Sequence, residues 1–396
     1  MMPNANDTLR QMRNEWSLSD GVTYLNHGSF GPSPKVVQQA RNDWSARLES
    51  EPMNFFFREM EDHLDAAAAA VGKFVGADAD DLVFVENATV GVNIVAANTR
   101  LQPGDEVLLT DQEYGSVQRI WRHACRDAGA QVVVKELPSP HVGDDQFVAD
   151  LMDAVTPRTR LIVCSHVTSA TATIFPIEKI CRTARERRVP ICVDGPHAVA
   201  MVPLDIRALG CDFYAASCHK WLSAPFGSGF LYVAGRRKQG LRPVITSWGR
   251  SLGGRPASWK DEFTWSGTRD PAAFLSVPAA IEFLESYGLE RFRQSTHELA
   301  RYARQEITRV TGLEAPVPES SDWYGSMIAL PLPALDVDPP EAWVPDPLQQ
   351  ALWDRYGIEV PVTRWRGRRL LRVSCHLYNS RDDIDRLADA LGSLLG

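Results

Sequence analysis

The stretch from Tyr214 to Leu222 reads YAASCHKWL and is the starting point for predicting the fold. A short apolar run ends at Ser217, His219 and Lys220 follow, and the chain then resumes as SAPFGSGFLYVAG. A lysine in that position is either a solvated residue at a strand end or an amine held in a pocket for chemistry. The surrounding sequence decides between the two.

Short apolar runs alternate with helical periods before this stretch. The apolar runs read DLVFVE, DEVLLT, QVVVKEL, RLIVCSH, VPICVD and CDFYAASC, and amphipathic segments such as SVQRIWRHACRDAG and IEKICRTARERR lie between them. Near-continuous apolar strands separated by amphipathic helices are typical of a mainly parallel sheet covered on both faces. The sequence therefore predicts an α/β fold that binds its ligand at the carboxyl ends of the strands.

The pattern changes after Pro271. Two helical segments, AAFLSVPAAIEFLESYG and ERFRQSTHELARYARQEITRVTG, precede three short strands and a closing helix, RDDIDRLADALGSLL. A chain of 396 residues is also too long for one small core. We expect an N-terminal arm (1–30) that contributes to the active-site entrance, a large domain (31–270) and a small α+β C-terminal domain (271–396).

Composition and charge exclude several classes of partner. The formal net charge of -8 argues against nucleic acid and anionic membranes, because both favour a basic face. No apolar run approaches the roughly 20 residues that cross a bilayer. The polar N-terminus MMPNANDTLRQMRNEW lacks the apolar centre of a secretory signal. We therefore expect a cytoplasmic protein with no nucleic-acid and no membrane partner.

The seven cysteines are odd in number and scattered along the chain. They form no C-x-x-C pair and no Cys/His cluster with zinc spacing. This pattern predicts reduced, mostly buried thiols and no metal chemistry.

Residues that could take part in catalysis follow two of the predicted strands. Asp194 ends the run VPICVD, and His197 follows three residues later. An isolated aspartate there is as readily a cap, but a buried carboxylate needs a cationic partner, and the ring nitrogen of pyridoxal 5'-phosphate (PLP) is one. Lys220, 26 residues further on, lies in an apolar setting that favours a neutral amine, which Schiff-base formation requires. Together, these residues after two neighbouring strands favour a catalytic site over a chance arrangement.

A phosphate site is expected if the cofactor is PLP. The run VFVENATVGVNIVAA places Asn87, Ala88 and Thr89 between a strand and a helix, and a helix N-terminus is an anion site. An ordinary N-cap explains the same residues equally well. No G-x-G-x-x-G follows a strand, and no G-x-x-x-x-G-K-[ST] occurs, so nicotinamide and nucleoside triphosphate cofactors lose support.

These motifs together resemble a known family. The segments DGPHA, SCHKWLSAPFGSGFLYV, NATVGVNIVA, DQEYGSVQRIW and FTWSGTRD are similar to those of the aminotransferase class V family, which are fold-type-I PLP-dependent enzymes. Within it, YLNHGSFGPSP, EPMNFFFRE, SHVTSATATIFPI and LLRVSCHLYNS most resemble the isopenicillin N epimerase-like branch. The resemblance runs from about Tyr24 to Asn379. It implies a large PLP-binding domain and a small C-terminal domain.

The resemblance implies roles around the cofactor ring. Lys220 would bind PLP as a Schiff base and later move the α-proton. Asp194 would pair with the pyridinium nitrogen, and His197 would hydrogen-bond the phenolic oxygen. Tyr114, in DQEYGS, would stack on the ring; otherwise it is a turn aromatic that fills the core.

The resemblance also implies how phosphate and subunits are arranged. Gly267 and Thr268, in WSGTRD, would reach the phosphate of the neighbouring subunit, which implies a homodimer with shared active sites. Four residues of the same chain would bind the phosphate: Ala88, Thr89, Ser217 and His219.

The substrate is then a small molecule of the amino-acid class. Arg372, in LLRVSCH, would clamp its α-carboxylate, since a planar fork matches a carboxylate; the alternative is a strand arginine paired with a surface acid. Asn26 and His27 would line the entrance, although a polar turn explains them almost as well. The segment SATAT lacks the Thr-Gly common in this family, so substrate contacts there are expected to differ.

The reaction is less constrained than the cofactor. We expect epimerisation or racemisation at an α-carbon, with a second proton donor such as Tyr114, His27 or a water on the face opposite Lys220. A C–S lyase that eliminates a β- or γ-substituent, or an aminotransferase, is the alternative. No cysteine occurs between Cys218 and Cys375, which argues against a desulfurase that uses a loop thiol. A protein that keeps the fold only for binding is a remote alternative.

Overall fold

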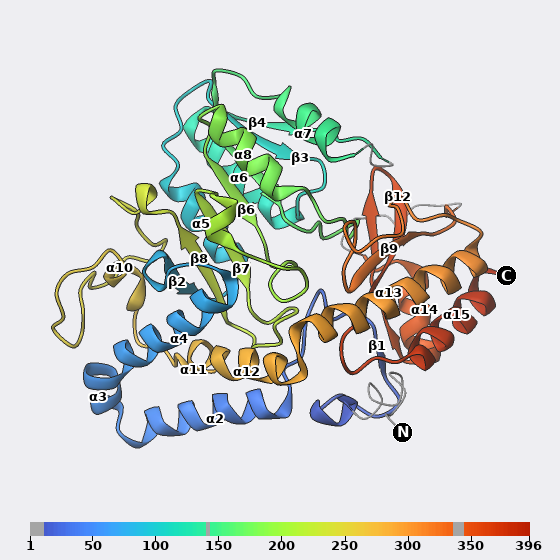
Figure 1. Ribbon diagram of the computed structural model, residues 1–396, viewed down its shortest axis with the longest axis horizontal. Coiled ribbons are helices and arrows are strands. Elements are labelled where there is room, and N and C mark those ends of the chain that lie inside the picture. Colours follow the sequence, from blue (N-terminus) through green and yellow to red (C-terminus); the bar gives the residue numbers. More distant parts are fainter. Residues whose placement is uncertain (1–11, 140–142, 336–343) are drawn as a thin grey trace.

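A seven-stranded sheet forms the centre of the molecule (Figure 1). The computed structural model describes residues 12–139, 143–335 and 344–396. The strand order is β2-β8-β7-β6-β5-β3-β4, and only β8 runs antiparallel to its neighbours. The prediction of a mainly parallel α/β sheet is therefore confirmed. The strands are β2 (Leu82–Val85), β3 (Glu106–Thr110), β4 (Gln131–Lys135), β5 (Thr159–Ser165), β6 (Ile191–Asp194), β7 (Phe213–Ser217) and β8 (Gly229–Val233).

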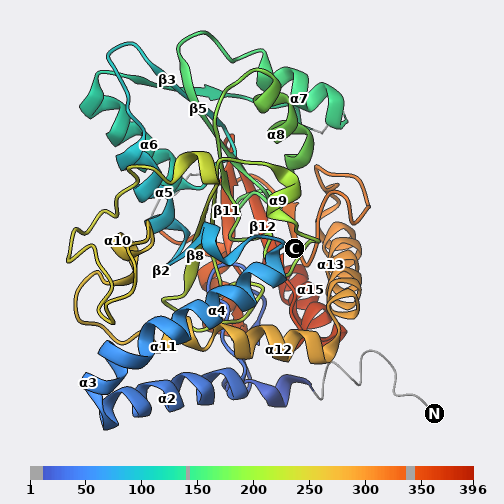
Figure 2. The ribbon, with the colours of Figure 1, turned by 60° about the vertical axis from the view of Figure 1, so that its left-hand side comes forward.

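Helices cover both faces of this sheet, as Figure 2 shows from a second direction. Alternate strand residues point to opposite faces, so Leu109 packs with Val92 and Trp121 of one helical layer, whereas Leu108 belongs to the core on the other side. The first layer is α5 (Ala88–Asn98) and α6 (Gly115–Ala128). The second includes α4 (Met60–Val75), α7 (Asp144–Met152), α8 (Ile177–Glu186) and α9 (Ile206–Leu209).

The N-terminal helices pack beneath the large sheet (Figure 1). They are α2 (Lys35–Ser50), α3 (Pro52–Asn54), a π-helical turn (Phe55–Glu59) and α4. Helices α11 (Ala272–Leu275) and α12 (Val277–Tyr287) pack against α2 and α4. Residues just beyond Pro271 thus bury their apolar side chains on the N-terminal helices.

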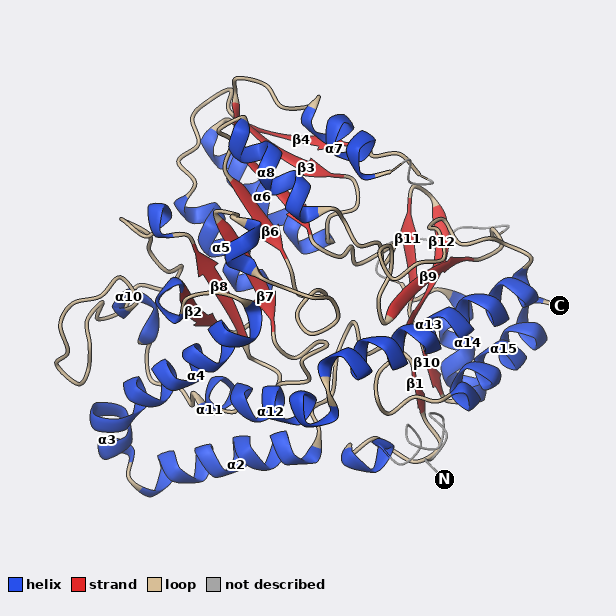
Figure 3. Ribbon diagram, viewed as in Figure 1, coloured by secondary structure: helices blue, strands red, loops and turns tan. Residues whose placement is uncertain are grey.

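The C-terminal part carries a smaller antiparallel sheet covered by helices (Figure 3). Its strand order is β11-β12-β9. The N-terminal strand β1 (Thr23–Tyr24) pairs in parallel with β10 (Ile358–Glu359), which ties the start of the chain to this part. The remaining elements are α13 (Leu289–Thr311), β9 (Met327–Pro331), α14 (Pro347–Tyr356), β11 (Val362–Trp365), β12 (Arg368–Ser374) and α15 (Arg381–Leu395).

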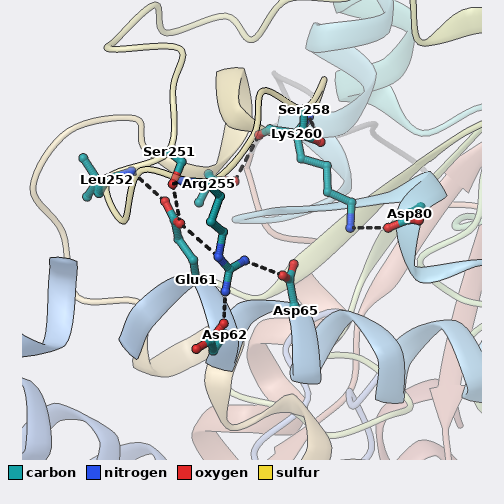
Figure 4. Close-up of polar contacts among 10 residues, drawn as sticks. Glu61, Asp62, Asp65, Asp80, Ser251, Leu252, Arg255, Ser258 and Lys260 are labelled. Atoms are coloured by element: carbon teal, nitrogen blue, oxygen red, sulfur yellow. Dashed lines mark hydrogen bonds and ion pairs between the residues drawn. The ribbon is translucent and has the colours of Figure 1, made fainter. Parts of the chain in front are cut away.

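A long segment between β8 and α11 is fastened onto helix α4 (Figure 4). The Arg255 guanidinium contacts three carboxylates of α4, those of Glu61, Asp62 and Asp65. Glu61 also accepts the backbone N–H of Leu252 at 2.7 Å. These contacts set the path of the chain toward α10 (Asp261–Thr264) and the residues that follow it.

All seven cysteines are buried and unpaired. Among the residues that the structure describes, no helix has the length and apolar character needed to cross a membrane.

Candidate active site

A cavity of about 250 Å³ opens at the carboxyl edge of the large sheet. Strands β2, β3, β5, β6 and β7 all end at this edge, because they run in the same direction. Nine of the thirteen residues singled out from the sequence line this cavity: Ala88, Thr89, Tyr114, Asp194, His197, Ser217, His219, Lys220 and Arg372.

Lys220 and His197 face each other in the cavity, with Nζ 2.9 Å from Nε2. The indole N–H of Trp221 donates to His197 Nδ1 at 3.4 Å, so Nε2 carries the ring proton of the neutral imidazole. A neutral Lys220 amine can accept that proton in a hydrogen bond. Burial lowers the pKa of Lys220, Arg372 lowers it further, and Asp194 opposes the shift. The pKa of Lys220 is thus lowered to about 7, so a large share of the amine is uncharged at neutral pH.

Asp194 ends β6 and is almost completely buried. Burial raises the pKa of its carboxyl group, and the charge of Lys220 lowers it in part. The protonation states of Asp194 and Lys220 therefore depend on each other. A carboxylate in this position would gain from a cationic partner inside the cavity.

The N-terminus of α5 forms one end of the cavity. Asn87 caps the helix by accepting the N–H of Val90 at 3.1 Å, and the N–H of Ala88 donates to Ser217 Oγ at 3.0 Å. Nδ1 of His219 is buried and has no hydrogen-bond partner in the described parts of the chain. Burial, and then Lys220, lower the pKa of His219 to about 4, so the ring is neutral. The Ser217 hydroxyl and the unpartnered His219 ring can still donate, and together with the N-terminus of α5 they provide an uncharged site for an anion.

Arg372, on β12, reaches the same cavity from the smaller sheet and is 3% exposed. Its guanidinium donates to the backbone oxygen of Ser169 at 2.8 Å and to the hydroxyl oxygen of Ser29 at 2.5 Å. Its Nε is buried without a partner among the described residues. The arginine is held by neutral acceptors rather than by an acid, so its charge remains available to an anionic ligand.

Tyr114 stands at the N-cap of α6 and is half exposed on the cavity wall. It does not fill the core, which was the alternative for this aromatic residue.

Asn26 and His27 lie behind the cavity wall rather than on it. Asn26 accepts from Arg372 at 3.5 Å and donates to Glu359 at 3.2 Å. His27 is fully buried, with Nε2 2.9 Å from the carbonyl oxygen of Lys220 and Nδ1 2.9 Å from the hydroxyl of Tyr378. Because a carbonyl oxygen only accepts, Nε2 carries the proton and the Tyr378 hydroxyl donates to Nδ1. His27 thus contacts the backbone of Lys220 instead of an entrance.

Gly267 and Thr268 do not line the cavity of their own chain. Thr268 is exposed, and an added Cβ on Gly267 would meet no atom within 4 Å.

Sequence reasoning missed several residues that line the cavity. Ser165 ends β5, so its position at a strand end was a usable signal. Ser29 and Ser169, which hold Arg372, lie in segments far apart in the chain, and no local pattern links them.

The close packing beneath Asp194 allows a direct test of its support. A Cβ on Gly195 would lie 2.1 Å from ring carbons of Tyr214, which is fully buried and hydrogen-bonded to His166 at 2.9 Å. We expect Gly195→Ala to lower the free energy of unfolding by about 1–3 kcal/mol, because the ring cannot move away. Urea unfolding measures this. Gly115→Ala, where no atom lies within 4 Å, is the control, and equal stabilities of the two variants would contradict the packing.

The cavity fits PLP on observations of this structure. The unpartnered His219 Nδ1 and the N-terminus of α5 suit a phosphate, the buried Asp194 suits a protonated ring nitrogen, and the neutral Lys220 amine suits the aldehyde. His197 offers an N–H for the phenolic oxygen, and Tyr114 offers a ring for stacking.

Comparison with known proteins gives the same cofactor class. The sequence profile of Aminotransferase class-V matches residues 24–387. An isopenicillin N epimerase of Amycolatopsis lactamdurans is 38% identical over 96% of this chain and 97% of its own length. Another from Streptomyces clavuligerus is 35% identical over 98% of both. A probable L-cysteine desulfhydrase of Arabidopsis thaliana is 28% identical over 97% of this chain and 86% of its own length.

Solved structures agree on the fold. A cysteine desulfurase from Escherichia coli superposes with a TM-score of 0.79 over 98% of both chains, at 24% identity. C-DES, solved with glycine covalently linked to its PLP cofactor, superposes with a TM-score of 0.80 over 96% of this chain and 98% of its own, at 21% identity. The profile match over most of the sequence and the two relatives above 30% identity establish the family. This chain belongs to the aminotransferase class-V family of PLP-dependent enzymes.

Proposed function

We propose that this enzyme inverts the α-carbon of an amino-acid substrate, as an epimerase or racemase similar to isopenicillin N epimerase. The observation that carries chemistry at the α-carbon is the pairing, in one cavity, of the Lys220 amine with an Arg372 whose Nε has no partner among the described residues. The two relatives of 35–38% identity favour this reaction over others of the family.

Each residue then has a task. Arg372 binds the α-carboxylate and orients the α-carbon toward Lys220. PLP, when bound, acts as an electron sink that makes the bonds to the α-carbon labile. Lys220 removes the α-proton, and its pKa, lowered by burial, keeps the amine ready to accept it. Asp194 holds the ring nitrogen, and His197 donates to the phenolic oxygen. Ala88, Thr89, Ser217 and His219 bind the phosphate.

Inversion also needs a proton donor on the other face. Tyr114 is on the cavity lining, whereas His27 is buried behind the carbonyl of Lys220. We therefore assign the second donor to the Tyr114 hydroxyl, directly or through a water.

The test is incubation of the holoenzyme with isopenicillin N, the compound in the names of these relatives, followed by chromatographic separation of the two epimers. We expect a mixture of epimers from either starting epimer. Unchanged isopenicillin N, together with sulfide release from L-cysteine, would instead support the second candidate.

That second candidate is a C–S lyase. It is favoured by the relatives of 28–29% identity that are named as L-cysteine desulfhydrases. A lyase uses the same Lys220 and Arg372 and needs no second proton donor.

A homodimer with shared active sites is part of the proposal. The supporting feature is a groove of about 800 Å³ between α5 and α6, whose lining includes Thr89, Ile120 and Val244. Exposed Ile245 and Trp248 lie near Val244 in sequence. Thr89 also lines the active-site cavity, so a second copy seated in this groove would reach the phosphate end.

Sedimentation of the holoenzyme tests this assembly, and we expect a dimer. Thr268→Ala should raise the dissociation constant for PLP by about tenfold, the effect of one hydrogen bond to a charged group. Thr311→Ala, at the end of α13, is the control. A monomer that binds PLP equally well with or without the Thr268 hydroxyl would contradict the shared site.

We also propose that the enzyme is cytoplasmic. Seven buried, unpaired thiols agree with a reducing compartment.

A further inference from the structure

A second buried carboxyl group lies beside the cavity and has no task in the chemistry above. Glu113 immediately precedes Tyr114 and is 4% exposed. In the ionised form one carboxyl oxygen accepts the Thr110 hydroxyl at 2.6 Å, and the other accepts the Ser165 hydroxyl at 2.6 Å; in the protonated form one of these hydroxyls accepts the carboxyl proton instead. The backbone N–H of Ser165 also donates to this carboxyl group. All three donors are neutral, so no opposite charge compensates an ionised Glu113.

Ser165 connects Glu113 with the cavity and with Asp194. Ser165 lines the cavity, and its register partner on the neighbouring strand β6 is Asp194. The other titratable groups that face Glu113 are the thiols of Cys164 on β5 and Cys192 on β6. Burial, together with the two carboxylates, raises the pKa of both thiols well above the ordinary value, so they remain neutral. Two carboxyl groups on adjacent elements therefore share one buried region.

We propose that Glu113 is a positioning residue of this active site. It keeps a proton near neutral pH, so that Asp194 is the single anion behind the cofactor. It also orients the Ser165 hydroxyl at the cavity wall. Like charges in one buried region resist joint ionisation. Asp194 lies beside Lys220 and, with PLP bound, would pair with the ring nitrogen, whereas Glu113 has only hydroxyl and amide partners, so the proton stays on Glu113. Burial raises the pKa of Glu113 to about 7, and Asp194 raises it as well, against the opposing hydrogen bonds.

The action of Glu113 on the cofactor rests on the proposed function, but its protonation can be tested without cofactor. The ordinary pKa of this carboxyl is 4.5, and the folded state raises it. The unfolded chain therefore loses the proton at a lower pH than the folded protein does. Glu113 should therefore contribute to the free energy of unfolding of the apo protein a part that falls as pH rises from about 4.5 to about 7. Glu113→Gln keeps the size of the side chain and cannot titrate, so the difference in unfolding free energy between the wild-type protein and this variant should show this fall, while Asp194 and the buried histidines titrate in both proteins.

Glu106, the first residue of β3, supplies a matched control, and Glu113 lies in the turn that follows the same strand. Glu106 is also buried, but its carboxylate pairs with Arg158 at 2.5 Å. Burial alone would raise the pKa of Glu106, but hydrogen bonds from donors including Thr156 and Arg158 hold it below the ordinary value. Glu106→Gln should change the pH dependence only below about pH 4.5, the ordinary glutamate range.

The holoenzyme then tests the effect on the cofactor. The visible absorption of bound PLP should show a pH-dependent step near 7 in the wild-type protein and in Glu106→Gln, and this step should be absent in Glu113→Gln. Glu113→Ala, which also removes the acceptor for Ser165, should weaken PLP binding by about tenfold, and glutamine should restore it.

Two results would overturn the proposal. One is a Glu113→Gln variant whose stability has the same pH dependence as that of the wild-type protein between pH 4.5 and 7. The other is a variant whose pH dependence differs from the wild type in this window while the absorption step of PLP is unchanged, since Glu113 would then titrate without acting on the cofactor site. If the wild-type protein took up no PLP, the proposed function would fail, and the apo titration would still show where the proton resides.

Discussion

Lys220→Ala is expected to abolish covalent attachment of PLP and to lower turnover by about 10⁴-fold, since a positioned proton acceptor contributes up to that factor. The reason is that Lys220 is the only lysine on the cavity lining of the described chain, and its neutral amine faces His197 at 2.9 Å. Borohydride reduction of the holoenzyme, followed by peptide mapping, should place the cofactor label on Lys220. Lys73→Ala, on the exposed side of α4, is the control for folding and should keep the label.

The same lysine predicts a pH dependence. Burial and Arg372 lower the pKa of Lys220, and only the neutral amine attacks an aldehyde. Uptake of PLP by the apo protein should therefore accelerate with rising pH and reach its plateau well below pH 10.5, the ordinary lysine pKa. Full uptake by Lys220→Ala, with a reducible adduct in the cavity, would show that another amine holds the cofactor.

Arg372→Leu is the second substitution with a large expected effect. It removes the only guanidinium on the cavity lining of the described residues, where a buried charge-assisted pair is worth about 2–4 kcal/mol. The Michaelis constant for an amino-acid substrate should rise about 30- to 1,000-fold. PLP should still bind, because Arg372 belongs to the smaller sheet and contacts Ser29 and Ser169, but its uptake should need a higher pH, since Arg372 helps to lower the pKa of Lys220.

Two further variants separate binding from folding. Arg372→Lys keeps the charge but loses the planar fork, so we expect an intermediate effect. Arg368→Leu, at the exposed start of the same strand, should leave the Michaelis constant unchanged. An Arg372→Leu enzyme with wild-type substrate affinity would place the carboxylate site elsewhere.

The large sheet could be predicted because its signal is local. Strands buried on both faces read as continuous apolar runs, and each run ends in the polar residues that meet at one edge. Asp194 and Lys220 were therefore candidates from their positions after two strands, whereas Ser217 was expected from the family resemblance. The antiparallel direction of β8 has no such signature, since β7 and β8 are equally apolar in either direction.

The remaining features depend on contacts between distant segments. One of the three short strands expected after Pro271 was GIEVPVTRW, but this segment divides into β10 and β11 around Pro361, and β10 pairs with β1 near the start of the chain. The same long-range pairing places His27 against the carbonyl of Lys220, where its stacking with His376, with ring centroids 3.9 Å apart, excludes solvent. Nothing near His27 in the sequence indicates either neighbour.

Proton NMR in D₂O tests the central claim most directly. The holoenzyme would be incubated with a panel of L-amino acids and thioether amino acids, and the products would then be separated by chirality. The account predicts exchange of the α-proton for deuterium and a mixture of both configurations, with Lys220→Ala inactive. Exchange with complete retention, or release of a keto acid with a thiol or ammonia, would contradict epimerisation and assign the cavity to a transaminase or a lyase.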